Sequence, residues 1–451
     1  MRWSQWVVGG VFLFFSADLF AVSRVKPELL SHIQVPFNQS LRIPRDLPLH
    51  MRFAGKFVHP DGKRREYPVQ SEGISIISHP SAPRLTGVKF PIQGQWFQGI
   101  SGMAWNSDGT VWMVSDNGFE SRQRSVDVPL LIYRARLDWQ SSEVRILEAH
   151  WLRDPNRVLP FGITNEGTKK RYLTGGDLDP ESIIQVGNRI FIGDSYGPHL
   201  LELTKKGILK NVWDLKLGKK TLMSPDHYSL RLPSQPGVVR FDIKRGNGVE
   251  GLTLSPDRKK LWLALGVALY QNEKADLESY NGRPYVRILE FDLESLDFTG
   301  KSFRYGLVGG YTRLSDFQVV DAQNAVLIER DRGEGELSMA CQGPFEPGCH
   351  NRPARYKRLI RVSLNPTPQG FFTTVSDLDL LSIQDPHGKS KIKKATELFS
   401  YPFSTIRSVL VTPQKQMILV NDNNYGMSSA RTFGKPDLTE FVLLKAEAFW
   451  E

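Results

Sequence analysis

Acidic side chains recur at the ends of short apolar segments along this 451-residue chain. The clearest case lies between Thr174 and Pro198, where acids flank two strand-like segments joined by Gly187 and Asn188. The acids at such positions are Asp116, Asp179, Glu181, Asp194, Glu250, Asp316, Glu329 and Asp422. Clustered carboxylates repel one another unless a cation or protons intervene. The pattern therefore predicts either a Ca²⁺ ion held by oxygen ligands or a carboxyl group with a raised pKa.

Two chemical roles follow for these acids. For acid–base catalysis the candidates are Glu181, Glu250 and Asp194, together with His199 in YGPHLL. The candidate Ca²⁺ ligands are Asp116, Asp179, Glu181, Glu250, Glu329 and Asp422. Each acid taken alone is also an ordinary turn residue after a strand, and a lone histidine such as His199 or His227 is also an ordinary structural group. The recurrence at matching positions favours a shared site.

Arginines accompany the acids. Arg189, Arg313, Arg330 and Arg407 lie in or beside the same segments, where they can bind a phosphate or carboxylate or can pair with neighbouring acids. The candidate ligand-binding residues are Arg330, Arg407, Asn421 and Asn423. A G-x-S-x-G nucleophile motif is absent from the sequence, and Ser101 in GISGM is a poor substitute.

The segments that carry these residues read as β-hairpins. Ser182 to Val186 and Arg189 to Gly193 are short apolar runs around a Gly-Asn turn. Five copies of this outline occur, within residues 99–118, 174–198, 247–266, 314–331 and 404–426. Further strand-like runs follow each copy, so each unit predicts a four-stranded antiparallel meander with long inserted loops.

Radial repetition of such meanders predicts an all-β fold, a β-propeller. Residues 51–90 contain further short strands that we interpret as an extra unit, which gives six blades. The last unit ends one strand short, so an N-terminal strand is expected to complete it. The predicted organisation is a signal peptide at 1–21, a lead-in segment at 22–50 and the propeller at 51–451.

The N-terminus and the cysteines indicate export. Residues 1–21 carry a basic Arg2 and an apolar run, as in a secretory signal peptide. An uncleaved anchor is the alternative, but Asp18 interrupts the run. In an exported protein Cys341 and Cys349 predict a disulfide, with free thiols as the alternative. We expect a periplasmic or extracellular protein without a stable membrane span after cleavage.

The net charge of +10 predicts anionic small-molecule ligands or cell-envelope partners. The lysine clusters are scattered over predicted turns, and a nucleic-acid-binding motif is absent from the sequence. We therefore expect no nucleic-acid partner, and we expect a monomer.

The motifs DLDPES, GDSYGPHLLELTKKG, NGVEGLTLSPD, LSDF, LIERD and VNDNN, taken in order, resemble the exported bacterial family named for the esterase-like activity of phytase. The resemblance spans about residues 90–445 and implies a β-propeller and a hydrolase of phosphate or other esters. The family's Asp-Pro-Glu-Gly motif falls on residues 179–182, and its Glu-Gly motif on residues 250–251. Its Glu-Arg pair falls on residues 329–330, and its Asn-Asp-Asn motif on residues 421–423.

Two departures from the family pattern reduce the acidic charge. Arg407 and Ser408 stand where the family carries Glu-Gly, and Ser195 stands where an acid is expected after Asp194. These changes predict a weaker metal site and a stronger preference for an anionic ligand.

Three functions remain open from the sequence. The first is a phytase-like or esterase-like hydrolase acting at a carboxylate-lined channel, with Ca²⁺ as its candidate cofactor. The second is a noncatalytic propeller that binds an anionic ligand or a cell-envelope partner, and Arg407 favours it. The third is a Ca²⁺-dependent lactonase-like propeller with an open metal position at the channel mouth.

Overall fold

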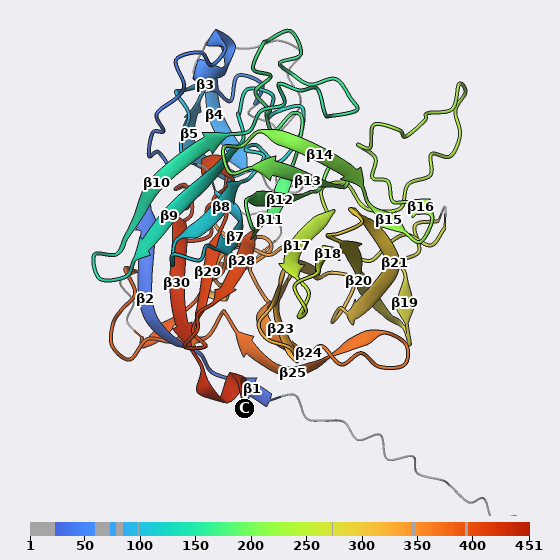
Figure 1. Ribbon diagram of the computed structural model, residues 1–451. Coiled ribbons are helices and arrows are strands. Elements are labelled where there is room, and N and C mark those ends of the chain that lie inside the picture. Colours follow the sequence, from blue (N-terminus) through green and yellow to red (C-terminus); the bar gives the residue numbers. More distant parts are fainter. Residues whose placement is uncertain are drawn as a thin grey trace, which may run out of the picture.

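The computed structural model describes residues 23–58, 73–77, 84–97, 99–272, 274–343, 348–392 and 396–451. Almost all regular structure in these ranges is β-strand, and five four-stranded antiparallel sheets surround a common centre (Figure 1). The expected signal peptide lies outside the described residues. The described part of the chain contains no helix with the length and apolar character of a membrane span.

Each sheet is one blade, and in the first four blades the strands run outward from the centre in chain order. The first blade contains β7 (Ile100–Trp105), β8 (Val111–Ser115), β9 (Leu131–Asp138) and β10 (Glu143–Trp151). The second contains β11 (Pro180–Val186), β12 (Arg189–Asp194), β13 (His199–Thr204) and β14 (Leu209–Asp214). The third contains β17 (Val249–Leu254), β18 (Lys260–Leu265), β20 (Arg283–Asp292) and β21 (Asp297–Gly306).

The last two blades differ in how their outer edges are covered. The fourth contains β22 (Arg313–Val319), β23 (Asn324–Arg330), β24 (Lys357–Ser363) and β25 (Phe371–Asp379). Its outer strand β25 also pairs in parallel with β21 and with β1 (Ser23–Val25). The fifth contains β28 (Ile406–Val411), β29 (Met417–Asn421), β30 (Thr439–Lys445) and β2 (Glu28–Val35). Strand β2 pairs antiparallel with β30, so an N-terminal strand completes the last blade, as expected.

The ring closes after five blades. The innermost strands contact each other in the order β7, β11, β17, β22, β28 and back to β7. One buried apolar cluster lies between each pair of neighbouring blades, which makes five such clusters in the described residues. The all-β propeller of four-stranded antiparallel blades is confirmed. The prediction of six blades is wrong, and the ring has five. Strands β28 and β7 pack directly against each other and leave no gap for another sheet.

The N-terminal strands interpreted as a sixth unit form two separate two-stranded pieces. Strands β3 (Phe53–Ala54) and β6 (Ile92–Gln93) make one piece, and β4 (Gly73–Ile77) and β5 (Arg84–Phe90) make the other. A sixth apolar cluster packs this region onto loop residues of the first and fifth blades, including Phe119 and Tyr425. The region therefore covers the ring instead of joining it.

The remaining short elements lie in loops. They are β15 (Lys216–Leu217), β16 (Lys220–Thr221), β19 (Ser279–Tyr280), β26 (Ile383–Gln384), β27 (Leu398–Phe399), and the 3₁₀ helices η1 (Leu49–Arg52), η2 (Leu337–Met339), η3 (Asn424–Gly426) and η4 (Glu447–Phe449).

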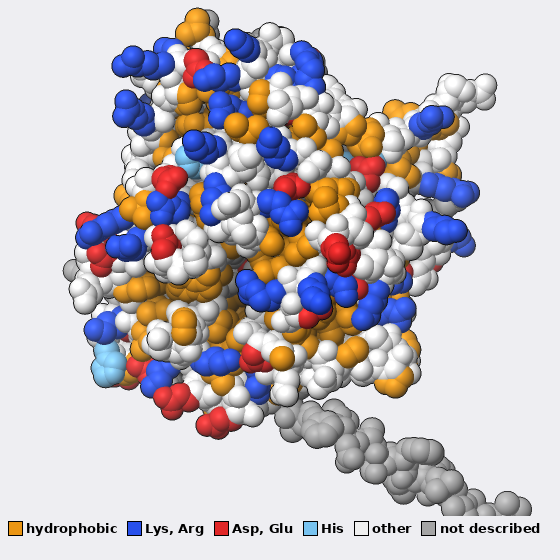
Figure 2. All heavy atoms as spheres, viewed as in Figure 1, with side chains coloured by type: hydrophobic (Ala, Val, Ile, Leu, Met, Phe, Trp, Pro, Cys, Tyr) orange, Lys and Arg blue, Asp and Glu red, His pale blue; other side chains and the backbone are white. Residues whose placement is uncertain are grey.

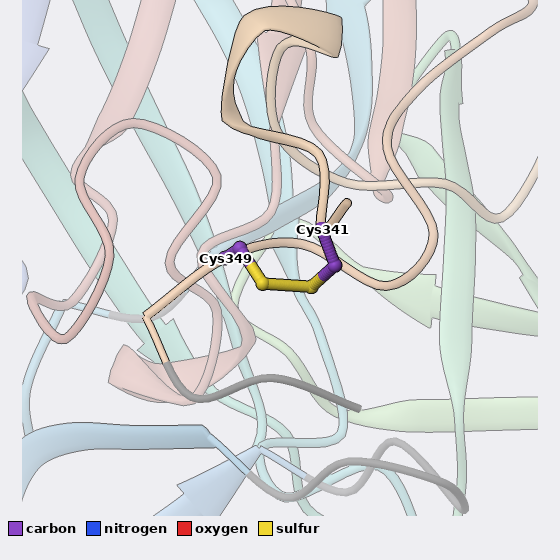
Figure 3. Close-up of a disulfide and its surroundings, with 2 residues drawn as sticks. All are labelled: Cys341 and Cys349. Atoms are coloured by element: carbon purple, nitrogen blue, oxygen red, sulfur yellow. A yellow bond between two sulfur atoms is a disulfide. The ribbon is translucent and has the colours of Figure 1, made fainter. Parts of the chain in front are cut away.

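A disulfide joins Cys341 and Cys349, as expected (Figure 3). It lies in the long connection between β23 and β24, which is residues 331–356. Figure 2 shows Lys and Arg side chains spread over the visible face and not gathered into one patch, which agrees with the scattered lysine clusters.

Candidate functional site

Every innermost strand carries a β-bulge at the same position near its start. In each pairing with the second strand of its blade, the register skips one residue. The five skipped residues, which we name the ring residues, are Ser101, Glu181, Glu250, Ser315 and Arg407. Bulges redirect side chains and are frequent beside active sites. The fold thus presents one residue from each blade at the same end of the central channel.

Small residues directly after the bulges allow the inner strands to approach closely. A Cβ on Gly102 would come within 2.7 Å of the Ser182 Cα, and one on Gly251 within 2.6 Å of the Phe317 nitrogen. Ser408 Oγ donates to Asp316 Oδ2 at 2.7 Å and accepts from the Met103 backbone N–H at 3.1 Å. These contacts bind neighbouring blades together and fix the ring residues in place.

The Arg407 guanidinium lies among three carboxylates. Its Nη1 is 2.8 Å from Glu181 Oε2 and 3.3 Å from Glu250 Oε2, and its Nη2 is 3.5 Å from Asp116 Oδ1. Burial lowers the pKa of Arg407, but Glu181 and Glu250 together raise it well above its ordinary value. The group is therefore a fixed cation in the middle of the acid cluster.

The acids around Arg407 still hold more negative charge than one guanidinium balances. Burial and the nearby Asp116 raise the pKa of Asp179 well above its ordinary value. Burial also raises the pKa of Glu181 well above its ordinary value, against the lowering effect of Arg407 and with Glu250 and Asp179 adding to the rise. A proton bound within this group would relieve the repulsion, so Asp179 and Glu181 are suited to keep a carboxylic acid proton to a higher pH than ordinary carboxyl groups do.

A group of cations lies near the acid cluster at the channel mouth, where Arg313 and Arg330 interact electrostatically with Glu181 and Glu250. Burial and then the neighbouring Arg332 lower the pKa of Arg313 to about 10. Burial and Arg313 lower the pKa of Arg330 well below its ordinary value, and Arg332 and burial lower that of Lys244. Arg313 Nε and Arg330 Nη2 find no hydrogen-bond acceptor among the described residues. Buried donors without partners beside like charges suit an anionic ligand.

The acids and cations line one cavity of about 540 Å³ at the channel mouth. Three long connections supply its walls: residues 116–130 after β8, residues 222–248 before β17, and residues 331–356 after β23. The last of these carries the disulfide and brings Arg332, Glu334 and Arg352 to the cavity. The charged lining residues are Asp116, Glu120, Arg122, Asp179, Glu181, Asp226, Lys244, Arg245, Arg313, Arg330, Arg332, Glu334, Arg352 and Arg407.

Several predicted site residues lie at or just below this cavity. Asp116, Asp179, Glu181, Arg330 and Arg407 line it. Glu250 is buried beneath the lining and contacts it through Arg407. Asp422 is also fully buried, and burial and Asp116 raise its pKa well above its ordinary value.

Other predicted acids are held by the fold and do not line the cavity. Asp194 accepts backbone N–H groups from residues 179 and 197, at 2.7 and 2.9 Å. Glu329 accepts from Thr312 Oγ1 at 2.6 Å and from Tyr305 Oη at 2.9 Å. Asp316 binds β28 through Ser408 Oγ and the Val409 N–H. These carboxylates fix strand ends and blade contacts.

The remaining predicted residues lie outside the lining as well. Asn421 accepts the Glu440 backbone N–H at 2.6 Å, and Asn423 accepts that of Tyr425 at 3.1 Å. His199 lies beside Asp214 and His227, next to a smaller neighbouring cavity. The sequence therefore placed these groups near strand ends without showing which way each side chain points.

The sequence patterns assign no part in the site to several residues that shape the cavity, although they offer Ser101 as a poor candidate nucleophile. Ser101 donates to Asp116 Oδ1 at 3.1 Å, and Asn117 Nδ2 donates to Asp179 Oδ1 at 2.7 Å. Arg332, Arg352 and Lys244 come from irregular loops without a repeated pattern. Asn117 follows Asp116 directly, and this Asp-Asn-Gly run was the one local signal available.

Asp116, Asp179 and Glu181 each offer a carboxylate oxygen, and these oxygens lie within 4.8 Å of one another. This acidic group could hold a metal ion. Ca²⁺ takes six to eight oxygen ligands, however, and the Arg407 guanidinium already contacts Asp116 and Glu181. With Arg407 in this position the residues present do not fit a Ca²⁺ ion.

Three of the solved structures that match the chain are weakly similar to it. Glutaminyl cyclase from Myxococcus xanthus is 9% identical, with a TM-score of 0.33 over 77% of this chain and 90% of that one. A gluconolactonase from Xanthomonas campestris is 11% identical, with a TM-score of 0.32 over 84% of this chain and 100% of that one. The PQQ-bound aldose sugar dehydrogenase from Streptomyces coelicolor is 12% identical, with a TM-score of 0.33 over 84% of this chain and 100% of that one. Identities and TM-scores this low do not support an inference about function.

The sequence comparison is more specific. No curated protein matches the chain. A family model described as "Esterase-like activity of phytase" matches residues 95–425, which is more than half of the chain and contains all five ring residues. The motifs singled out from the sequence lie in the same range. The chain therefore belongs to this phytase-like family.

Proposed function

We propose that the protein binds an anionic ester in the cavity at the channel mouth and hydrolyses it there. Phosphate esters are the first candidates for this substrate. The observation that supports this most is that one cavity is lined both by several cations and by carboxyl groups whose pKa is raised. The cations bind the charged part of the substrate, and the acids donate a proton to the leaving group.

The cationic residues of the cavity would hold the phosphate. Arg313 offers a half-buried guanidinium group at the cavity wall, and the exposed Arg332 and Lys244 add two further charges. Guanidinium groups bind phosphate oxygens through paired, charge-assisted hydrogen bonds. Burial and neighbouring positive charges lower the pKa values of these groups. An anion bound among them would offset this repulsion and stabilise the charged forms of the cations.

The carboxyl groups of the cavity would supply the proton. Asp179 or Glu181, protonated because of its raised pKa, donates a proton to the leaving oxygen as the ester P–O or C–O bond breaks. Water adds to the phosphorus or carbonyl carbon, and the resulting carboxylate takes up the proton that this water loses. Glu250 holds Arg407 in position from below and does not touch the cavity.

Ca²⁺ has no step in this proposal. Arg407 provides a positive charge at the carboxylates that a metal ion would otherwise neutralise. We therefore propose that Ca²⁺ binds weakly and that hydrolysis proceeds without it. We also propose that the protein is exported and acts as a monomer, and the disulfide supports an oxidising compartment.

The test is hydrolysis of phytate, p-nitrophenyl phosphate and p-nitrophenyl acetate by the purified protein, with and without Ca²⁺. We expect turnover of at least one phosphate ester without Ca²⁺, and loss of it in a Glu181→Ala/Glu250→Ala variant. A Glu447→Ala variant, changed at an exposed residue that does not line the cavity, is the control. Turnover that survives the double substitution would contradict the proposed site.

A second function is favoured by one observation, the position of Arg407 within the acid cluster. If Arg407 and its acids form only an ion-pair network, the cavity binds an anion without chemistry. Absence of turnover on all three esters, combined with saturable binding of inorganic phosphate or phytate, would establish this noncatalytic role.

A further inference from the structure

Two histidines and an aspartate meet outside the channel, on the second blade. His199 begins β13 and Asp214 ends β14, and the two residues lie directly opposite each other in the antiparallel pair. His227 comes from the connection between β16 and β17. That connection folds back because the Ser224 N–H donates to the Gly197 carbonyl at 3.0 Å. Three segments thus bring one side chain each to the same point.

The spacing of their donor atoms suits a single metal ion. His199 Nδ1 is 3.0 Å and His227 Nε2 is 3.6 Å from Asp214 Oδ1, and all three atoms lie within 4.8 Å of one another. In a tetrahedral zinc site with bonds of about 2.0–2.1 Å, neighbouring ligand atoms are about 3.3–3.4 Å apart. The distances of 3.0 and 3.6 Å to Asp214 Oδ1 fall on either side of that value.

The two imidazole nitrogens that face Asp214 are buried, and both approach the same carboxylate oxygen. His199 is 2% exposed and His227 is 3% exposed. Neither His199 Nδ1 nor His227 Nε2 has a hydrogen-bond partner of good geometry within the described ranges. Both nitrogens therefore compete for a single carboxylate oxygen, Asp214 Oδ1, and a metal ion bound among the three atoms would give each of them a properly directed partner.

The surrounding residues orient this group as second-layer partners orient metal ligands. Tyr228 Oη donates to Asp214 Oδ2 at 2.9 Å, which leaves Oδ1 to face the imidazoles. The Tyr228 ring stacks on His227 at 4.8 Å between centroids, and the Phe161 ring stacks on His199 at 5.9 Å. The positions of both imidazole rings are therefore fixed by packing.

The proton on His227 depends on Ser229. Ser229 Oγ lies 2.8 Å from His227 Nδ1 and can accept a hydrogen bond from an Nδ1–H group, which leaves the Nε2 lone pair for a metal. The Ser229 backbone N–H lies 3.1 Å from the same nitrogen and favours the opposite tautomer. Metal binding must shift this balance toward the hydroxyl contact.

We propose that His199, Asp214 and His227 form a binding site for one divalent transition-metal ion, for which Zn²⁺ is the best match. Imidazole nitrogen ligands favour Zn²⁺ and its neighbours over Ca²⁺ or Mg²⁺. A cavity of about 240 Å³ borders His199 and can supply a water molecule as the fourth ligand. Arg122, Tyr196 and Asp226 line both this cavity and the one at the channel mouth, so the ion would lie next to the proposed substrate pocket.

The test is a calorimetric titration in which Zn²⁺ alone is added to the purified protein after treatment with a chelator. We expect one Zn²⁺ per chain. Asp214→Asn and His227→Gln should weaken binding at least ~100-fold, because each removes one of three ligands. His150→Gln, which changes a half-buried histidine on β10, should bind Zn²⁺ as the unchanged protein does. Glu181→Gln should also leave Zn²⁺ binding intact, which separates this site from the acid cluster.

A second measurement does not depend on any variant. Co²⁺ added to the unchanged protein should give the intense visible absorption bands of a four-coordinate site. Addition of one equivalent of Zn²⁺ should then remove those bands. The proposal is overturned if Co²⁺ gives no such bands, if the protein takes up no Zn²⁺, or if Glu181→Gln abolishes binding while His227→Gln does not.

Discussion

Arg407 Nη1 lies 2.8 Å from Glu181 Oε2, and both residues are the bulged residue of their innermost strand. Two blades that are not neighbours in the ring therefore place a cation and an anion in direct contact at the channel mouth. This pair replaces the repulsion expected between two acids at these positions. The chemistry of the site depends on which charge each bulge carries.

Arg407→Glu should create a Ca²⁺ site. The substitution gives the ring a third carboxylate beside Glu181 and Glu250, with Asp116 close by, and removes the competing cation. We expect the unchanged protein to bind Ca²⁺ weakly, and the variant to bind it at least ~10-fold more tightly and to melt at a higher temperature when Ca²⁺ is present. Arg245→Glu makes the same charge change at an exposed cavity residue and should gain no such site. Equal Ca²⁺ affinity in all three proteins, by calorimetry, would contradict this prediction.

The rate of hydrolysis should fall as pH rises through the raised pKa of the carboxyl pair formed by Asp179 and Glu181. The proton donor is present below that pKa and is lost above it, and the raised value moves the loss to higher pH than for an ordinary carboxyl group. Glu181→Gln should lower kcat ~100-fold or more and should remove or shift this limb of the pH profile. A pH profile unchanged in the variant would mean that Glu181 is not part of the proton donor.

Anion affinity should depend on the loop cations. Arg332→Gln and Lys244→Gln should each weaken phosphate or phytate binding ~10-fold, because a hydrogen bond to a charged group contributes about 1.5–3 kcal/mol. Lys219→Gln removes the same charge from an exposed turn away from the cavity and should have little effect. Affinities that fall equally in all three variants would indicate attraction by net charge alone.

The closure between β2 and β30 should weaken in acid. Burial would raise the pKa of Glu440, but Arg431 and then His32 lower it to about 2. A depressed carboxyl pKa stabilises the fold above the unfolded value of 4.5, and this stability is lost as pH falls toward 2. The contribution is about 3 kcal/mol. Urea unfolding across this pH range should show the loss in the unchanged protein and in the exposed-site control Glu447→Gln, whereas Glu440→Gln should be less stable already at neutral pH.

The disulfide should support the cavity wall. Replacing Cys341 and Cys349 with serine frees the connection that carries Arg332 and Arg352 to the cavity. We expect a loss of about 2–3 kcal/mol in unfolding free energy and weaker phosphate binding, while the ring of blades stays folded. Far-ultraviolet circular dichroism and phosphate calorimetry together check this. Unchanged phosphate affinity would show that the connection holds its position without the bridge.

Local sequence patterns were sufficient for the hairpins, the four-stranded units and the disulfide. Strand periodicity and turn residues act over a few positions, so runs such as Ser182 to Val186 and Arg189 to Gly193 are visible without tertiary information. The same holds for acids such as Asp116 and Glu181, which lie next to those runs. The family resemblance extended these local signals over most of the chain.

Only the tertiary structure decided how many blades close the ring and where the side chains point. The strands of residues 51–93 have the patterning of a blade, but Met103 and Ser408 join the first and fifth blades directly and exclude a sixth. The bulges that aim Glu181 and Arg407 into the channel arise from pairing between strands, which the order of residues does not display. His199, Asp214 and His227 meet for the same reason: residues far apart in the sequence become neighbours only when strands pair and loops fold back. Local physics determined the units of this protein, and packing between them determined its sites.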